Sequence, residues 1–254
     1  MDGGGASSAR LGLALVAGAS WLYLLYMAWG MANMDVPAAQ LLMPAMLHWR
    51  AADLTLVFLM WAIMMAAMML PSAAPMVRVF ARSAEAQTGH SPDLLTNAFI
   101  AGYLAVWTAF SAGMTLAQWG LLELRLMTPM MESASDWLSG ALLIAAGAFQ
   151  FTAFKHACLN KCRTPLGFLL AEWRPGPGGA FVMGLRHGAY CTGCCTMLML
   201  LLFVLGVMNL LWILVLTLVV LAEKLLPPEI NWPSRVLGAG LIAWGGYLLL
   251  TTTS

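Results

Sequence analysis

The fold is decided by a stretch that reads DLTLVFLMWAIMMAAMML, residues 53–70, in which Asp53 is the only charged residue. A helix of this length can cross a hydrocarbon core of about 30 Å, and it pairs every backbone N–H and C=O internally. Similar apolar runs recur along the 254 residues. The chain is 61% hydrophobic and 9% charged, with a mean hydropathy of +0.82, whereas soluble domains carry about a quarter charged residues. We therefore expect an all-α, polytopic transmembrane helical bundle that forms a single integral membrane domain, residues 1–254.

The lengths of the apolar runs and the positions of helix-breaking proline and glycine residues predict where the membrane spans lie. Pro71 and Pro75 are expected to close the second span, and a bend near Gly206 and Asn209 is expected to divide a run that is too long for one span. The first run is expected to be a retained span and not a cleaved signal peptide. Seven spans are predicted, at residues 11–31, 53–70, 95–122, 136–155, 180–206, 209–226 and 234–251.

The distribution of lysine and arginine predicts the orientation. In the seven-span arrangement only Arg50 and Arg125 fall on one side, and the other ten of the twelve cations fall on the opposite side. Because cytoplasmic loops are enriched in Lys and Arg, the N-terminus is expected inside and the C-terminus outside, in the cytoplasmic (inner) membrane of a bacterium. The chain has no long basic tract, so nucleic acid is not an expected partner. The ten residues on the cationic side are Arg10, Arg78, Arg82, Lys155, Lys161, Arg163, Arg174, Arg186, Lys224 and Arg235.

The five cysteines are clustered rather than scattered. Cys158 and Cys162 are four residues apart after the fourth span, and Cys191, Cys194 and Cys195 lie in the fifth. On a helix the side chain of His187 shares a face with these last three thiols. A single buried cysteine packs as a small hydrophobe, and reduced thiols are expected in the cytoplasmic half of the membrane. Five cysteines within 38 residues, with histidines beside them, instead favour metal binding or thiol redox chemistry.

Methionine is the second chemical signal. The second span carries one stripe of Met60, Met64 and Met68 and another of Met65 and Met69. Such stripes are usually flexible core packing. This span is expected to bring Met65, Met68 and Met69 toward the cysteines, however, and thioether, thiolate and imidazole together form the soft ligand set that selects Cu(I). Copper is therefore the expected metal, with zinc as the alternative, although the spacing matches no standard zinc motif.

Three charged residues are predicted at the ends of spans, namely Arg186, Glu223 and Lys224. Ionisable groups in a membrane usually pair or serve function, and the alternative is that they extend to the interface. Gly184 and Gly188 have the small-xxx-small spacing that lets another helix approach closely.

Three motifs in order carry a resemblance to a known family. They read MMAAMMLPSAAP at residues 64–75, KHACLNKCRTP at 155–165 and GLRHGAYCTGCC at 184–195. The chain from the second span onward resembles a bacterial family of predicted metal-binding integral membrane proteins whose function is unknown. The resemblance implies metal binding by a membrane protein and leaves the metal and the ligands open.

The sequence supports one main hypothesis and two rivals. The main hypothesis is a metal-handling membrane protein that binds Cu(I) for delivery or transport. His187, Cys191, Cys194 and Cys195 would form the principal ligand face. Cys158 and Cys162 would form an access or second site, and a metal donor or membrane complex would be the partner besides the lipid bilayer. The first rival is a membrane thiol oxidoreductase that uses Cys191 and Cys194, with their reactivity promoted by nearby cations. The second is a non-catalytic subunit of a larger membrane complex.

Overall fold

The computed structural model describes residues 4–33, 35–36, 49–86, 89–127 and 135–252. All regular elements of these residues are α-helices, as the composition predicts. They are α1 (Gly4–Ala32), α3 (Ala51–Ala84), α4 (Pro92–Glu123), α5 (Asp136–Phe149), α6 (Ala153–Arg163), α7 (Pro165–Glu172), α8 (Gly176–Leu200), α9 (Leu202–Leu205), α10 (Leu210–Leu225) and α11 (Trp232–Thr252).

The helices contain five to six candidate membrane spans, so the chain has the form of a multi-pass membrane protein. Within the described residues five segments are long and apolar enough to cross: Leu11–Ala32, Ala51–Ala84, Pro92–Glu123, Gly176–Leu205 and Trp232–Thr252. The pair α5 and α6 would supply a sixth if the two helices form one bent span. The predicted span 209–226 matches α10 in position, but its 16 residues rise only about 24 Å.

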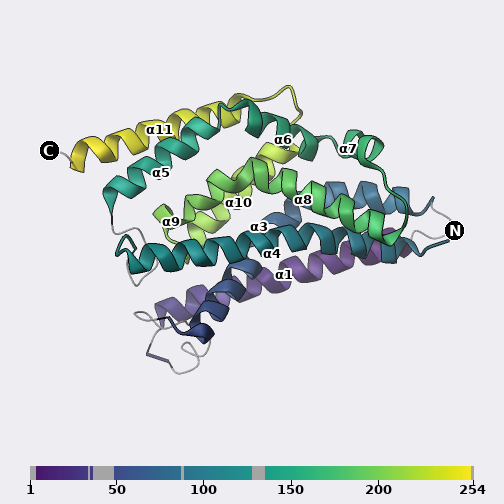
Figure 1. Ribbon diagram of the computed structural model, residues 1–254, viewed down its shortest axis with the longest axis horizontal. Coiled ribbons are helices and arrows are strands. Elements are labelled where there is room, and N and C mark those ends of the chain that lie inside the picture. The colour runs from purple at the N-terminus through teal and green to yellow at the C-terminus, as the bar shows by residue number, and fades with distance from the viewer. Residues whose placement is uncertain (1–3, 34, 37–48, 87–88, 128–134, 253–254) are drawn as a thin grey trace.

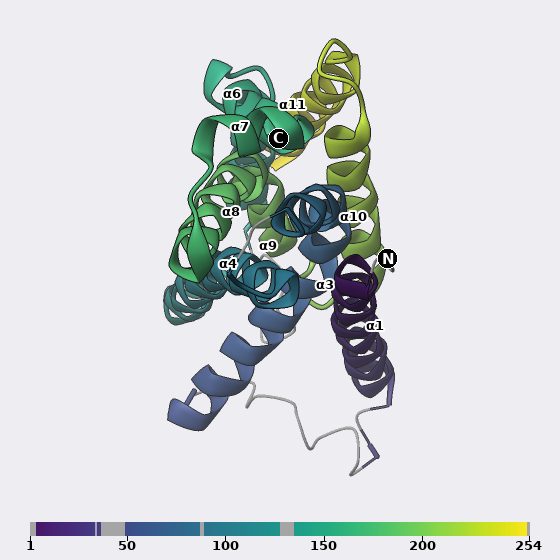
Figure 2. The same cartoon turned by 90° about the vertical axis from the view of Figure 1, so that its right-hand side faces the viewer.

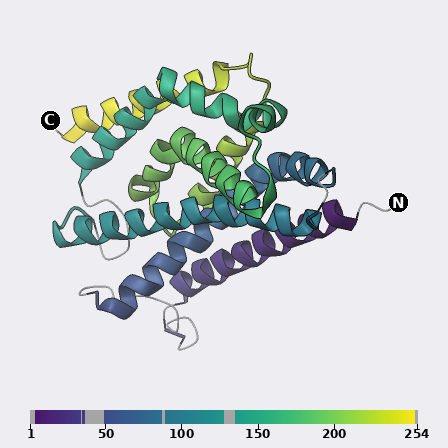
Figure 3. The same ribbon diagram turned by 45° about the vertical axis from the view of Figure 1, so that its right-hand side comes forward.

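The helices lie roughly along one axis of the molecule (Figure 1), and the N- and C-termini lie at opposite ends of that axis. Helices α5 and α11 pair on one side, and α1 lies on the opposite side against α3 (Figures 2 and 3). Between them α4 packs along α8, which is the most extensive contact in the bundle, and α3 packs on α4. The short helix α6 lies on α8, so α6, α8 and α10 meet in the interior.

Helix α3 does not end at its prolines, contrary to the sequence-based expectation. It continues through Pro71 and Pro75 to Ala84. Pro71 lacks the N–H that would bond the carbonyl four residues earlier, which is that of Ala67. The indole N–H of Trp21, from α1, donates to this carbonyl at 3.1 Å. A neighbouring helix thus supplies the hydrogen bond that proline removes, which is how membrane helices tolerate proline.

The contact between α4 and α8 depends on glycine, as the small-xxx-small spacing predicts. A Cβ on Gly184 would collide with the backbone carbonyl of Phe99, and a Cβ on Gly188 would meet Val106 Cβ at 3.0 Å. Across the seam, a Cβ on Gly102 would lie 2.9 Å from the backbone nitrogen of Leu185. The two backbones therefore approach closely, and α8 places its cysteine face against α4.

Two breaks shape the half of the bundle that carries cysteines. The predicted span 136–155 contains a bend that the sequence did not indicate, because α5 ends at Phe149 and α6 leaves it at an angle of 64°. Thr152 begins α6 by accepting a hydrogen bond from the backbone N–H of Lys155. The second break is the predicted one at Gly206, whose φ of 92° ends α9 in a conformation that favours glycine.

Candidate functional site: a buried thiol cluster

Helix α8 places its three cysteines and His187 in the interior of the bundle. Cys191, Cys194 and Cys195 are each 1% exposed, and His187 is 3% exposed. The helix is continuous from Gly176 to Leu200, so the shared face predicted from the spacing of these residues is present. All five cysteines of the chain are free thiols.

Four thiols lie close together, and we call Cys162, Cys191, Cys194 and Cys195 the thiol cluster. The Sγ atoms of Cys194 and Cys195 lie 3.3 Å apart, and Cys194 Sγ donates to the carbonyl of Cys191 at 3.1 Å. Cys195 lies within interaction range of Cys191. Cys162, a half-buried residue of α6, lies within interaction range of Cys191 and Cys194. The bent helix α6 thus brings a fourth thiol to the three on α8.

Cys158 occupies a different position from Cys162, although both are on α6. Its Sγ would lie 2.9 Å from a Cβ on Gly193, so it packs on the backbone of α8 beside the cluster. Gly193 also lines a cavity of about 450 Å³ together with Phe154, Thr192 and Met197. Cys158 therefore touches a residue that lines a cavity at the side of the bundle, although its own side chain is not part of that lining.

A lysine and a tyrosine from two other helices converge on Cys191. Lys224 Nζ, at the end of α10, donates to Cys191 Sγ at 2.8 Å and to Ser72 Oγ at 2.8 Å. Tyr103 Oη, from α4, lies 3.1 Å from the same sulfur and 3.3 Å from the carbonyl of Met69. The sulfur of Cys191 is thus contacted from α4 and α10, and the same lysine and tyrosine also bond to α3 through Ser72 and the carbonyl of Met69. Sequence reasoning singled out Lys224 as a membrane charge but missed Tyr103 and Ser72, which carry no pattern of their own.

The methionines of α3 form the buried face of that helix. Met65, Met68 and Met69 are all 0% exposed. The hydroxyl of Ser72 donates to the carbonyl of Met69 at 2.8 Å, so this segment joins the site through its backbone and through Ser72.

His187 has an unsatisfied ring nitrogen. Its ring stacks on Tyr103 with centroids 5.7 Å apart and meets the edge of Phe168 at 5.4 Å. Within the described part of the chain, Nδ1 is buried and has no hydrogen-bond partner. A buried polar atom without a partner costs free energy, and a metal ion is one partner that an imidazole nitrogen takes.

A second buried network lies beside the thiols. Lys155 Nζ contacts Glu223 at 2.6 and 2.8 Å and also donates to Gln150. Ser234 donates to the same carboxylate at 2.6 Å. Glu223 and Lys224 are therefore buried and paired rather than extended to the interface, and this decides between the two alternatives left open by the sequence. Arg186 is exposed and pairs with Glu172, so it follows the interfacial alternative.

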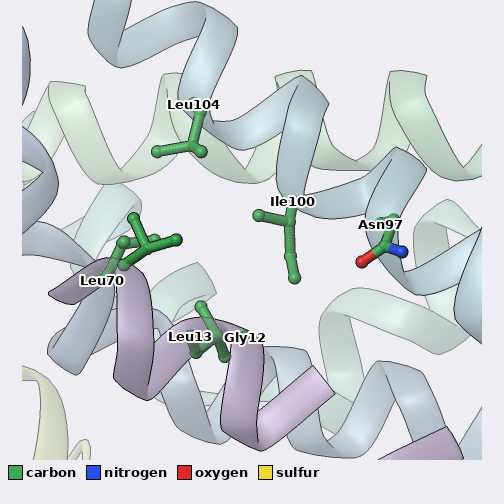
Figure 4. A pocket seen from close by; sticks show the side chains of 7 residues that line it. Gly12, Leu13, Leu70, Asn97, Ile100 and Leu104 are labelled. Atoms are coloured by element: carbon green, nitrogen blue, oxygen red, sulfur yellow. The ribbon is translucent and has the colours of Figure 1, made fainter. Parts of the chain in front are cut away.

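One further cavity lies apart from these groups. It has a volume of about 140 Å³ and lies between α1, α3 and α4. Figure 4 shows Leu13, Leu70, Ile100 and Leu104 around it, with Asn97 at one side. Its lining residues include no cysteine or histidine, so it offers no ligands for a soft metal.

The donor set fits Cu(I) better than a hard cation. Thiolates and imidazole are soft or borderline ligands, whereas Mg²⁺ and Ca²⁺ need several oxygens. Among the residues that the structure describes, no three His, Cys, Asp or Glu side chains already form a group that could hold an ion. Cu(I) can be held by two thiolates, and Cys194 and Cys195, whose sulfurs lie 3.3 Å apart, are one such pair of neighbours.

The fold and the site together define a class: a multi-pass helical membrane protein with a cluster of free thiols, three of them buried on α8. The family model PpoB2, a copper chaperone family, matches residues 58–248. The match covers most of the chain and includes every candidate site residue named above, so the protein belongs to this copper chaperone family. Membership implies copper binding, which agrees with the copper expectation and with the resemblance to metal-binding membrane proteins. No curated protein and no solved structure gives a significant match.

Proposed function

We propose that this protein binds Cu(I) at the thiol cluster and passes it on within the membrane. The observation that carries the proposal is the gathering of four thiols from two helices: Cys191, Cys194 and Cys195 touch one another along α8, and Cys162 of α6 lies beside them. Isolated buried cysteines have no reason to gather from two helices, whereas soft thiolates that share a site select Cu(I). Membership of a copper chaperone family supports the choice of metal.

Each predicted ligand has a role in this proposal. Cys191 and one further thiol of the cluster hold the ion. His187 lies beside them and offers its unpartnered Nδ1. Cys158, next to the lateral cavity, is the site of first capture or of release. The thioethers of Met65, Met68 and Met69 accept the ion when it moves deeper into the bundle.

We further propose that the chain crosses the bacterial inner membrane seven times, with the N-terminus inside and α10 as a short crossing. The termini lie at opposite ends of the long axis (Figure 1), which supports an odd number of crossings. Helices α3, α6 and α10 carry basic residues in their last turns. These residues support a cytoplasmic location for the C-terminal ends of the three helices. A reporter that is active only outside the cytoplasm, fused after Ser254, should be active. The same fusion after Arg82 should be inactive.

The test of copper binding is a comparison of metal content. The detergent-purified protein, reduced and anaerobic, is loaded with Cu(I) beside a variant with Cys191, Cys194 and Cys195 changed to serine. Because serine oxygen is a poor ligand for soft metals, we expect near-stoichiometric copper in the wild type and its loss in the folded triple variant. Equal copper in both proteins would refute the ligand assignment.

One observation favours a second candidate function, a thiol oxidoreductase. The Lys224 ammonium contacts Cys191 Sγ, and a neighbouring cation favours the reactive thiolate. Oxidation of the Cys191 thiolate and the Cys194 thiol to a disulfide would release one proton and pass two electrons to an acceptor such as a quinone. A Cys194→Ser variant that accumulates a mixed disulfide with a thiol substrate would favour this function over copper transfer.

A further inference from the structure

We propose that Lys224 is the fixed counter-cation of the thiol cluster and that it makes the site prefer a monovalent soft cation over a divalent one. The inference rests on the proposed function, because it concerns a metal held at Cys191. It names the class of cargo as Cu(I) and its chemical analogue Ag(I), with Zn(II) disfavoured.

Lys224 is buried beside the thiol cluster, and no carboxylate among the described residues pairs with it. The residue is 6% exposed, and its Nζ contacts Cys191 Sγ and Ser72 Oγ. Among the described residues, no carboxylate lies within ion-pair distance of this ammonium, because Glu223 pairs with Lys155. The C-terminal turn of α10, in which Lys224 lies, favours a cation through the helix dipole but does not neutralise it.

The buried charged groups carry a net positive charge before the cysteines are counted. A buried cation without a counter-charge costs several kcal/mol, and ionisable groups inside membranes therefore pair. The charged side chains buried in the described chain are Lys155, Glu223 and Lys224. Lys155 and Glu223 cancel, which leaves one positive charge. The group that faces this charge is Cys191, and its thiolate is the anion that balances it.

The same balance applies when a metal is bound. Two thiolates and Cu(I) carry a net charge of −1, which the Lys224 ammonium brings to zero. Two thiolates and Zn(II) carry no net charge, so the buried ammonium would lose its counter-charge and would also repel the divalent ion more strongly. The ammonium can donate to the sulfur in the free and in the loaded site, because a thiolate keeps lone pairs beyond the one given to a metal.

The neighbouring contacts fix this charge in place. Glu223 is held by Lys155 and by Ser234, and this anchors the last turn of α10. Ser72 accepts from Lys224 while donating to the carbonyl of Met69. The ammonium therefore has little freedom to leave when a metal arrives, which is the condition for an electrostatic preference.

The experiment measures the preference between two metals in the purified, reduced full-length chain. Four proteins are compared with the wild type: Lys224→Leu, Lys224→Gln, Lys224→Arg and the control Lys161→Leu. Lys161 is a half-buried lysine of α6, and leucine carries no donor atom for a metal. Cu(I) affinity is measured by competition with bicinchoninate and Zn(II) affinity by competition with a chromophoric zinc chelator.

We expect the Cu(I)-to-Zn(II) affinity ratio to fall at least about tenfold in Lys224→Leu and Lys224→Gln, because the charge that favours the monovalent ion is gone. Lys224→Arg and Lys161→Leu should keep the wild-type ratio. Two neutral variants are used so that either one, if folded, gives the answer. A wild-type ratio in a folded neutral variant overturns the inference and leaves the proposed function intact. A wild-type protein that binds no Cu(I) overturns both.

Discussion

Glu223 and Lys224 are adjacent at the end of α10, and they bind in opposite directions. Lys155 Nζ forms an ion pair with Glu223 Oε1 at 2.6 Å. Lys224 Nζ lies 2.8 Å from Cys191 Sγ. One turn of helix therefore joins an ion pair shared with α6 to the sulfur at the centre of the thiol cluster. A substitution in the ion pair is therefore expected to affect the thiol cluster, and a substitution in the thiol cluster is expected to affect the ion pair.

The ion pair should be costly to break from one side only. Lys155→Met leaves the carboxylate of Glu223 buried without its cation, and the expected loss is about 3–5 kcal/mol of the free energy of unfolding. The double variant Lys155→Met/Glu223→Gln removes both charges and should recover much of that loss. Denaturant unfolding of the detergent-solubilised proteins measures the difference. A single variant as stable as the wild type would contradict the buried pair.

The glycine seam gives a prediction about the fold alone. Gly184→Ala puts a methyl group against the backbone of Phe99, and overpacking of this kind costs about 1–3 kcal/mol. Gly113 is the matched control on α4, because nothing lies within 4 Å of its Cβ position. Gly113→Ala should be neutral or slightly stabilising. Thermal unfolding of the two variants tests the contrast, and equal melting temperatures would argue against the close approach of α4 and α8.

Much of the fold follows from apolar length. The predicted segments coincide with α4, α10 and α11 to within three residues, and the predicted span 11–31 lies inside α1, which begins at Gly4. Helix is the structure expected there, because a membrane makes unpaired backbone groups costly. Predictions of helix ends from local sequence were wrong where a contact with another helix determines the local structure. Proline predicts a helix end, but the indole of Trp21 satisfies the carbonyl that Pro71 frees. The bend after Phe149 was missed for a similar reason, since it depends on contacts of α6 with α8.

The candidate site was predictable on one helix and not between helices. Periodicity alone puts His187 and the cysteines of α8 on one face. It could not tell Cys162, which joins these thiols, from Cys158, which packs on Gly193. Nor could it show that Lys224 faces Cys191. The sequence pattern of a lysine near a helix end fits a residue that extends to the membrane interface equally well. Such pairings are set by helices far apart in the sequence.

Tyr103 should modulate the Cu(I) affinity of the site without being a ligand of the metal. Tyr103→Phe removes the hydroxyl that lies 3.1 Å from Cys191 Sγ and keeps the ring that stacks on His187. A neutral hydrogen bond contributes about 0.5–1.5 kcal/mol, so Cu(I) affinity should change by roughly 2- to 10-fold. Tyr247, exposed on α11, provides the control Tyr247→Phe. If both variants bind Cu(I) like the wild type, Tyr103 has no part in the site.

The two cysteines of α6 should differ in their effect. Cys162→Ser removes a sulfur that lies beside Cys191 and Cys194. Because the site loses one soft ligand, we expect the Cu(I) affinity to fall tenfold or more. Cys158→Ser should leave the equilibrium affinity nearly unchanged and slow the rate of loading. Stopped-flow transfer from a Cu(I) chelator, together with competition titration, separates the two quantities. Equal losses of affinity would show that the two thiols act alike.

Sulfur from the thiol cluster should bind the Cu(I) ion, and X-ray absorption spectroscopy of the Cu(I)-loaded protein measures this directly. We expect a first coordination shell dominated by two or three sulfur atoms, with at most one nitrogen from His187. We also expect this sulfur signal to be lost in Cys191→Ser. A first shell of nitrogen and oxygen, or a sulfur shell unchanged by that substitution, would contradict binding by the thiol cluster.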